Sequence, residues 1–361
     1  MFIRRGDLQS TFVHLPATLM EPVDLRSDVL SRPTGAMIDA MTAAARERTY
    51  FGLREDPHQQ LLEHKVAQLL GHEDALLFPT CTMANEVALQ LLTRPGDLVA
   101  APSDAHMVTS EANAPAVLSG VRIESVAGTA PMPPLAAWER MAGRRGDTQN
   151  PRVSTFAIEN SHNRAGGAVV DAAYTCELGQ LAKRYGLHLM VDGARLFNAA
   201  VALGCEPREL ARHADTVSIS LNKSLGAPNG AMLAGSRELI DRALVLRHRL
   251  GGGFRPTGIL AAAAMVALES WPRLVDDHQR ARRLYTGLSA MAGLTLQEPA
   301  TNILIVVIEV PGLTPHLLCQ RMAERGVLAM PFGEDRIRMV TYRDIDDAAI
   351  DLAIAAMAQC L

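Results

Sequence analysis

Two predicted strands near the middle of the sequence end at residues that could do chemistry together. The apolar stretch 188–191 runs into Asp192, and the alternating stretch 216–221 leads to Lys223. Successive parallel strands end at the same edge of a sheet, so we expect the acid and the lysine at one site. A lysine amine forms a Schiff base with the aldehyde of pyridoxal phosphate (PLP), and a carboxylate keeps the pyridine nitrogen of that cofactor protonated. The pair therefore predicts an enzyme that uses PLP.

Three other strand ends carry side chains that suit such a cofactor. Cys81 and Thr82 open a predicted helix, whose free N–H groups and Thr82 hydroxyl could hold a phosphate. His106 follows another strand end, where an imidazole could stack on a pyridine ring. The polar stretch 159–164, which contains His162, follows a third. Each feature also has an ordinary explanation, such as a helix cap, a structural histidine or a surface turn. Their chain order lets one sheet edge gather them into one pocket.

The signatures of other common α/β enzymes do not occur in the sequence. There is no GxGxxG after the first predicted strand, no GxxxxGK[ST], no GxSxG and no clustered metal-ligand spacing, so we expect no metal. A net charge of -4 without a long run of Lys or Arg argues against nucleic acid or an anionic membrane as a partner. A small-molecule partner is expected instead.

Length and composition fit two domains in a reducing compartment. With 361 residues, 48% hydrophobic and 4% aromatic, the chain can bury one large and one smaller core of mainly aliphatic side chains. Its five cysteines form no CxxC pair, and their odd number argues against a disulfide framework. Arg4 and Arg5 lead into polar residues instead of an apolar signal segment, and no apolar run approaches the length of a membrane span. We therefore expect a soluble protein of the cytoplasm.

The hydrophobic pattern predicts an α/β fold with a mostly parallel sheet and helices on both faces. Strands are predicted over 75–78, 97–101, 121–126, 153–159, 188–192, 216–221 and 230–234, with helical patterns between most of them. Beyond 235, helices are predicted over 237–250, 257–293, 314–325 and 345–359, and strands over 302–310 and 336–341. We assign 1–25 to an N-terminal arm, 46–270 to a large PLP-binding domain, and 26–45 with 271–361 to a small α+β domain.

From about Asp24 to the C-terminus, the chain resembles the threonine aldolase and β-eliminating lyase group of fold-type I PLP enzymes. The resemblance rests on Asp24-Leu25-Arg26-Ser27-Asp28, Thr82-Met83-Ala84-Asn85, Ala105-His106, Glu159-Asn160 with His162-Asn163-Arg164, Asp192-Gly193-Ala194-Arg195, Lys223 with Leu225-Gly226-Ala227-Pro228, Gly251-Gly252-Gly253 with Arg255, and Arg338 with Val340-Thr341. So many motifs in the same order are highly specific for the group.

The resemblance implies a role for each cofactor-side residue. Lys223 would bind the cofactor as a Schiff base, and Asp192 would face the pyridine nitrogen. His106 would stack on the ring and take part in proton transfer. The backbone of Cys81, together with Thr82, would hold the phosphate.

The resemblance also implies a substrate site and an assembly. Ser27, Arg195 and Arg338 would bind the substrate carboxylate, for which a bidentate guanidinium is well shaped. His162 would lie near the β-hydroxyl of the substrate. Arg255 would reach the phosphate from a neighbouring subunit, which implies a homodimer or homotetramer with shared active sites.

Several positions depart from the group's pattern. Thr80-Cys81-Thr82 stands where Ser-Gly-Thr is usual, Leu53 or its neighbours lack an active-site tyrosine hydroxyl, Tyr342 replaces a histidine, and His248 replaces a lysine before the glycines. The cofactor machinery is thus retained while the substrate side has changed. We therefore expect threonine to be a poor substrate compared with a β-hydroxy amino acid that has a more apolar side chain.

The sequence predicts a threonine aldolase-like lyase that cleaves, or forms, the Cα–Cβ bond of a β-hydroxy-α-amino acid to give glycine and an aldehyde. The alternative is β-elimination or replacement at the same cofactor, or carbon–carbon bond formation in a biosynthetic pathway. A cofactor-binding protein without catalysis is disfavoured, because Lys223 and the three candidate carboxylate-binding residues are retained.

Overall fold

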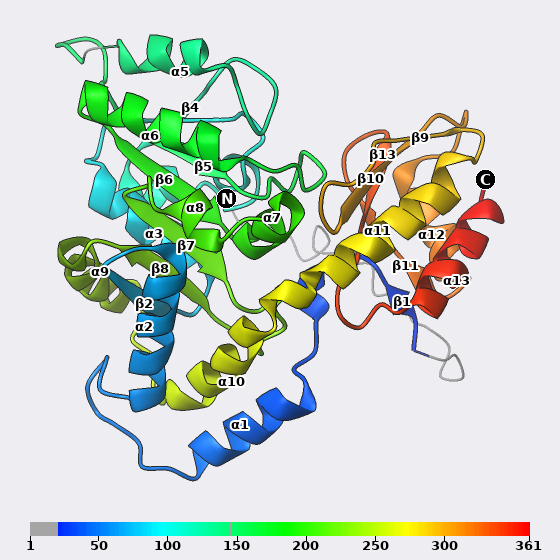
Figure 1. The fold of residues 1–361 in the computed structure, drawn as a ribbon. Coiled ribbons are helices and arrows are strands. Elements are labelled where there is room, and N and C mark those ends of the chain that lie inside the picture. Colours follow the sequence, from blue (N-terminus) through cyan, green and yellow to red (C-terminus); the bar gives the residue numbers. More distant parts are fainter. Residues whose placement is uncertain (1–20, 145) are drawn as a thin grey trace, which may run out of the picture.

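A seven-stranded sheet forms the centre of the larger part of the molecule (Figure 1). The computed structural model describes residues 21–144 and 146–361. The sheet has the order β2-β8-β7-β6-β5-β3-β4, and β8 alone runs antiparallel to its neighbours. The strands are β2 (Asp74–Phe78), β3 (Leu98–Ala101), β4 (Arg122–Ser125), β5 (Val153–Glu159), β6 (His188–Gly193), β7 (Thr216–Ser220) and β8 (Ala231–Gly235). The carboxyl ends of the other six strands therefore lie along one edge of the sheet.

Helices cover both faces of this sheet, which confirms the predicted fold class. They are α2 (Pro57–Leu70), α3 (Cys81–Leu92), α4 (His106–Thr109), α5 (Leu135–Ala142), α6 (Ala172–Tyr185), α7 (Leu196–Leu203), α8 (Pro207–Ala211), α9 (Arg237–Arg249) and α10 (Gly258–Glu269). Neighbouring strand residues alternate between two cores. Phe156 packs in the core under α2, α6 and α10, whereas Ala157 packs in the core under α3 and α9. Burial on both faces explains why strands such as β3 and β8 contain only apolar residues and glycine.

A smaller antiparallel sheet lies beside the large one, at the other end of α11 (Leu274–Ser289) (Figure 1). Its order is β12-β13-β10-β9, with β9 (Leu294–Leu296), β10 (Ile303–Ile308), β12 (Met330–Pro331) and β13 (Arg336–Val340). α12 (Pro315–Ala323), α13 (Asp347–Ala358) and α11 help to form its core, which contains Leu318, Met357 and Leu284. β1 (Val23–Asp24) pairs in parallel with β11 (Val327–Leu328) in a separate two-stranded sheet.

The single helix predicted over 257–293 is wrong. The segment consists of α10 and α11, separated by the short helix Trp271–Arg273, and the chain bends by 56° between them. Pro272 has no N–H to donate, which ends the regular hydrogen-bonding of α10. Within 21–144 and 146–361, no single helix is long and apolar enough to cross a membrane. Only this bent pair reaches that length and composition, and Ala261 and Ala267 of α10 are buried in the large core.

The N-terminal segment differs in part from the prediction. Residues 1–20 of the predicted arm lie outside the described residues, but Val23–Asp24 forms β1 and pairs with the small domain. α1 (Gly35–Ala45), predicted to belong to the small domain, contributes Met37 to the core of the large sheet. The other domain limits stay a prediction.

Candidate active site

The carboxyl edge of the large sheet brings together most of the residues predicted to act on a cofactor. α3 begins at Cys81 after β2, and α4 begins at His106 after β3. His162 follows β5, Asp192 is the fifth residue of β6, and Lys223 lies three residues beyond β7. Asp192 pairs with Ser218 across β6 and β7, so the acid and the lysine come from neighbouring strands.

Asp192, Cys81 and Lys223 form the centre of this edge. Asp192 is only 2% exposed. Its Oδ2 accepts a hydrogen bond from Asn85 Nδ2 at 2.9 Å, and its Oδ1 accepts one from the Ala194 N–H at 3.0 Å. Burial raises the pKa of the Cys81 thiol to about 12, with a further contribution from the Asp192 charge, and the Lys223 ammonium opposes the shift. The charges of Asp192 and Lys223 therefore both affect the pKa of the Cys81 thiol, so the acid and the lysine lie within one site.

The first turn of α3 is suited to an anion. Thr80 caps the helix, because its Oγ1 accepts from the Met83 N–H at 3.2 Å. The N–H groups of Cys81 and Thr82 belong to the turn that has no intrahelical acceptor. Since Thr80 is the cap, the Thr82 hydroxyl is not needed for that role. These N–H groups and the helix dipole fit a phosphate group.

The two histidines both lie near Oε2 of Glu159. The His106 N–H donates to Glu159 Oε2 at 2.7 Å, and the His106 ring places Nδ1 2.9 Å from Glu111 Oε1. The hydrogen bond to Glu111 raises the pKa of His106, against the effect of burial. His162 is fully buried, with Nε2 3.7 Å from Asp104 Oδ1 and 3.8 Å from Glu159 Oε2. Both predicted proton-handling rings are therefore next to carboxylates.

Arg195 is already paired with a buried acid. Its Nε and Nη2 donate to Asp28 Oδ2 and Oδ1 at 2.8 and 2.7 Å, and Ser224, the neighbour of Lys223, donates to Asp28 at 2.8 Å. Burial alone would raise the pKa of Asp28, but the Arg195 guanidinium outweighs it and holds that pKa well below its usual range. Arg195 therefore has less capacity for a substrate carboxylate than the sequence implied.

Arg338 retains hydrogen-bonding capacity. Its Nη1 donates to Asn163 Oδ1 at 2.9 Å and its Nη2 to the Arg26 carbonyl at 3.0 Å, while its buried Nε has no partner among residues 21–144 and 146–361. Burial lowers the pKa of Arg338 to about 10, so it remains a cation at neutral pH. Ser27, next to Arg26, has a hydroxyl that accepts from the Val29 N–H at 3.4 Å and can still donate. Arg338 and Ser27 are therefore the better candidates for binding a carboxylate.

Arg255 is the one predicted site residue that the described chain does not bring to this edge. Its side chain is exposed and stands over the exposed Phe51 ring, 5.4 Å from the ring centroid. The preceding glycine loop does reach α3, because a Cβ built on Gly252 would lie 2.5 Å from Met83 Sδ. A contact of Arg255 with a phosphate stays a prediction.

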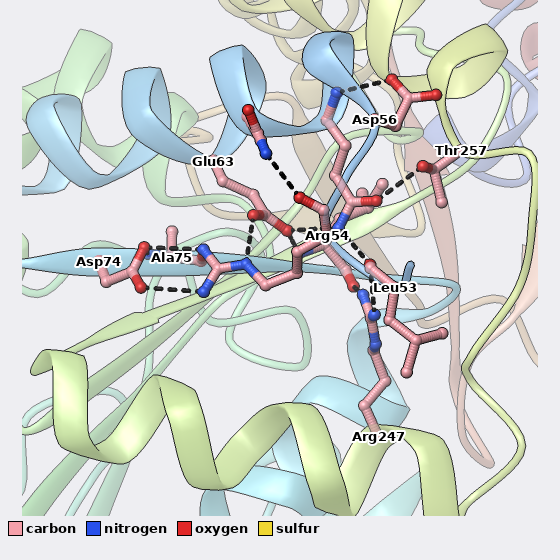
Figure 2. A network of polar contacts seen from close by, with 11 residues as sticks. Leu53, Arg54, Asp56, Glu63, Asp74, Ala75, Arg247 and Thr257 are labelled. Atoms are coloured by element: carbon pink, nitrogen blue, oxygen red, sulfur yellow. Dashed lines mark hydrogen bonds and ion pairs between the residues drawn. The ribbon is translucent and has the colours of Figure 1, made fainter. Parts of the chain in front are cut away.

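A buried polar network holds the segment before α2. Figure 2 shows Arg54 between two acids, with its Nε 2.8 Å from Glu63 Oε2 and its Nη2 2.9 Å from Asp74 Oδ1. The Leu53 carbonyl accepts from Arg247 Nη2 at 3.2 Å. The backbone of Leu53 is therefore fixed by structural contacts.

The two replacements expected to alter substrate binding make structural contacts within the fold. The Tyr342 side chain is 4% exposed in the small-domain core, and its hydroxyl donates to the Asp24 carbonyl at 2.9 Å. The Leu53 side chain contacts the backbone at Gly253, where a Cβ would lie 3.2 Å from Leu53 Cδ2. Tyr342 is therefore a core residue, and it gives no support to a changed substrate pocket.

Five further polar residues of the site had no predicted role: Asp28, Asn85, Glu111, Ser218 and Ser224. Asp28 and Asn85 were recognised only as parts of motifs. Of the other three, only Glu111 has a local signal in the sequence. It is a lone acid five residues after His106, within a stretch of small residues.

Replacing Asp28 by asparagine is expected to lower the free energy of unfolding by about 3–5 kcal/mol at neutral pH, because the buried Arg195 loses its opposite charge. A carboxylate with a depressed pKa stabilises the fold fully above the ordinary aspartate pKa of about 4, and this contribution is lost as the pH falls through the folded value. The difference between the two proteins should therefore shrink below about pH 4. Urea denaturation at several pH values measures it.

Asp351→Asn is the matched control, because Asp351 forms an exposed ion pair with Arg283 at 2.7 Å. It should change stability little at any pH. If both variants lost the same free energy of unfolding at neutral pH, the buried Asp28–Arg195 pair would stabilise the fold no more than the exposed pair does.

Comparisons with known proteins agree with this site. The profile of the family described as Beta-eliminating lyase matches residues 24–311. The chain is 35% identical to low-specificity L-threonine aldolase 1 of Arabidopsis thaliana, covering 95% of this chain and 97% of that protein. It is 37% identical to the low specificity L-threonine aldolase of Escherichia coli K12, covering 90% and 94%. The structure of Leishmania major threonine aldolase superposes with a TM-score of 0.80 at 19% identity, covering 94% of this chain and all of that one.

The residues at the sheet edge fit the cofactor of this family. Lys223 supplies the amine, the buried Asp192 supplies the carboxylate, and the first turn of α3 supplies N–H donors for a phosphate. The buried atoms His162 Nε2 and Arg338 Nε also have no hydrogen-bond partner within the described parts of the chain, as expected where a ligand binds. The chain belongs to the beta-eliminating lyase family, and it is a threonine aldolase-like enzyme that depends on PLP.

Proposed function

We propose that the protein cleaves the Cα–Cβ bond of a β-hydroxy-α-amino acid and releases glycine and an aldehyde. The observation that supports this reaction most is the position of His106 and His162 around Glu159, with Arg338 joined to the same loop through Asn163. A carboxylate site beside two proton-handling rings suits a substrate that carries both a carboxylate and a β-hydroxyl. The same arrangement would also serve the synthetic direction.

Some side chains of the site would bind the cofactor and substrate, and others would transfer protons. PLP, when bound, withdraws electrons from the Cα of an amino acid. Lys223 would hold the cofactor covalently, and Asp192 would keep its ring nitrogen protonated. Ser27 and Arg338 would bind the substrate carboxylate and set its orientation, which is how a fixed guanidinium lowers the entropy cost of reaction. A histidine would take the proton from the β-hydroxyl.

A product assay tests the proposed reaction. The purified holoenzyme is incubated with several β-hydroxy amino acids, and glycine and aldehyde are measured separately. Equal amounts of both are expected. Substrates that change the cofactor absorbance but yield no glycine would instead favour β-elimination or replacement.

A cavity beside the site would accept the substrate side chain. Its volume is about 430 Å³, and its wall includes Asp104 from the large domain and Ile303, Ile305 and Val307 from β10. Ile305 lies directly opposite Arg338 in the β10–β13 pair, so both side chains are on the same face of the small sheet. Asp104 in turn lies 3.7 Å from His162 Nε2. The cavity therefore adjoins both the carboxylate site and the histidine.

A β-hydroxy amino acid with a bulky apolar substituent is expected to have a kcat/KM about 10- to 200-fold above that of threonine, the range that apolar contacts of this size produce. Ile305→Trp should narrow the cavity and reduce this advantage, while kcat/KM for threonine changes little. Steady-state kinetics on both substrates measures the ratio, and threonine serves as the control within each protein. Threonine as the best substrate of the wild type would contradict the cavity's role.

The assembly and the compartment also remain proposals. A homodimer or homotetramer with shared active sites is supported by the apolar ring of Phe51, which is 86% exposed and lies next to Arg255. Sedimentation velocity would reject it if the protein had the mass of one chain. A cytoplasmic location is supported by the five cysteines, all of which are free. Localisation of a tagged full-length protein tests it.

A further inference from the structure

A chain of buried hydrogen bonds connects His106 to Asp192. Glu111, whose side chain is 0% exposed, lies with Oε1 2.9 Å from His106 Nδ1. Asn85 Nδ2 donates to the same Glu111 oxygen at 3.0 Å and to Asp192 Oδ2 at 2.9 Å. Ser218 Oγ donates to Asn85 Oδ1 at 2.6 Å. The carboxylate of Asp192 and that of Glu111, which contacts the ring of His106, are therefore held by the same amide.

The chemistry of its partners sets the orientation of the Asn85 amide. Its NH₂ group has two hydrogens, and two carboxylate oxygens accept them. The opposite orientation would place the amide oxygen against both Glu111 and Asp192, which is repulsive. Asn85 thus fixes Glu111 in place without neutralising its charge.

Glu111 also decides which nitrogen of His106 carries the proton. A carboxylate only accepts hydrogen bonds, so the neutral imidazole must hold its hydrogen on Nδ1, which leaves the lone pair on Nε2. The His106 side chain is 30% exposed, unlike Glu111 below it. The basic nitrogen is therefore the one that is not engaged by the buried network.

His162 has the opposite arrangement. The Ala165 N–H donates to His162 Nδ1 at 3.2 Å, so the neutral ring holds its hydrogen on Nε2. That Nε2 faces two acceptors, Asp104 Oδ1 at 3.7 Å and Glu159 Oε2 at 3.8 Å. Neutral His162 can therefore donate a hydrogen bond at Nε2 but cannot accept a proton there.

We propose that Glu111, fixed by Asn85, is a positioning residue that makes His106 Nε2 the proton acceptor of the reaction, and that His162 Nε2 acts only as a donor. The assignment of these two roles rests on the proposed aldol cleavage. In the cleavage direction, His106 Nε2 receives the β-hydroxyl proton as the Cα–Cβ bonding electrons pass to the glycine fragment and the C–O bond becomes the aldehyde carbonyl. A proton then adds to Cα of that fragment, which completes glycine. In the reverse direction the same proton returns.

The charges around His106 give the proposal a dependence on pH. The acids that face the ring are Glu111, Asp192 and Glu159, and all of them favour the protonated form. His106 therefore keeps its proton to a higher pH than an ordinary histidine. Activity that needs its free Nε2 should fall on the acid side, and Glu111→Gln should move that acid limb to lower pH.

The test is nitrogen NMR of protein labelled with ¹⁵N-histidine, measured on the cofactor-free full-length chain. The His106 signals are assigned by their loss in His106→Gln, and the His162 signals by their loss in His162→Gln. In the wild type, neutral His106 should be protonated on Nδ1 and neutral His162 on Nε2. Finding either ring in the other tautomer would overturn the proposal. This readout is independent of the reaction, so it separates failure of the proposal from failure of the proposed function.

Variants of Glu111 then test its role. Glu111→Gln should lower the pKa of His106 and reduce kcat by about 10- to 100-fold, part of what a positioned base supplies. Glu111→Asp, which keeps the charge, should restore part of both. Glu86→Gln is the matched control, because Glu86 is a buried acid of α3 bonded to Ser119 at 3.0 Å. An unchanged His106 titration in Glu111→Gln would overturn the proposal, as would an equal shift in the control. If Glu111→Gln does not fold, the tautomers of His106 and His162 in the wild-type protein test the proposal.

Discussion

Lys223→Ala protein is expected to lose more than about 10⁴-fold in turnover, because removing a covalent nucleophile removes its whole contribution. The charge of Lys223 helps to lower the pKa of Asp28 and opposes the rise in the pKa of Cys81, so this lysine lies near both residues. The variant should also lose the visible absorbance band of the covalently held cofactor. Absorbance spectra and single-turnover assays measure both effects.

The composition of the chain makes the attachment site easy to map. The sequence contains only three lysines, Lys65, Lys183 and Lys223. Borohydride reduction should fix the cofactor to a single peptide that contains Lys223. Lys183→Ala is the control, since Lys183 lies near the end of α6, where the chain enters the opposite edge of the sheet at β6. A labelled peptide without Lys223, or retained absorbance in Lys223→Ala, would refute the assignment.

The second large effect is expected for Asp192→Asn, with turnover reduced by about 10²–10⁴-fold while the cofactor still binds. Asparagine keeps the shape of the side chain but removes the charge that would pair with a protonated ring nitrogen. In the wild type, Asn85 Nδ2 and the Ala194 N–H both donate to the Asp192 carboxylate. The new NH₂ group would face one of these two donors. One buried donor is then left without an acceptor.

Cofactor content and turnover should be measured on the same preparation, so that weak binding is not mistaken for slow chemistry. Asp215→Asn provides a control, because Asp215 precedes β7 at the other edge of the sheet and its Oδ2 accepts from the Leu189 N–H at 2.8 Å. That variant should keep near-normal turnover per folded enzyme. Near-normal turnover in Asp192→Asn would exclude the proposed charge pairing.

The sequence by itself determined the large sheet and the residues at its strand ends. A strand such as Leu98–Ala101 is apolar and buried at every position, so it stands out locally, and Ser103 and Asp104 mark its end. Because all strands except β8 run in one direction, the chain order alone placed Lys223, Asp192 and His106 at one edge. The small domain was predicted less completely, since strands of two or three residues such as β1 and β9 leave too short a pattern.

Only the tertiary structure decided what each charged side chain does at that edge. The resemblance implies that Arg195 binds the substrate carboxylate, and the structure adds a pairing with Asp28, 167 positions away. Tyr342 reads as part of the pocket, but its hydroxyl bonds to the Asp24 carbonyl, 318 positions away, in the small-domain core. Local periodicity reports which residues are buried, because neighbours within one turn or one strand set it. The partner of a buried charge depends on which distant segments pack against it, and no spacing along the chain encodes that contact.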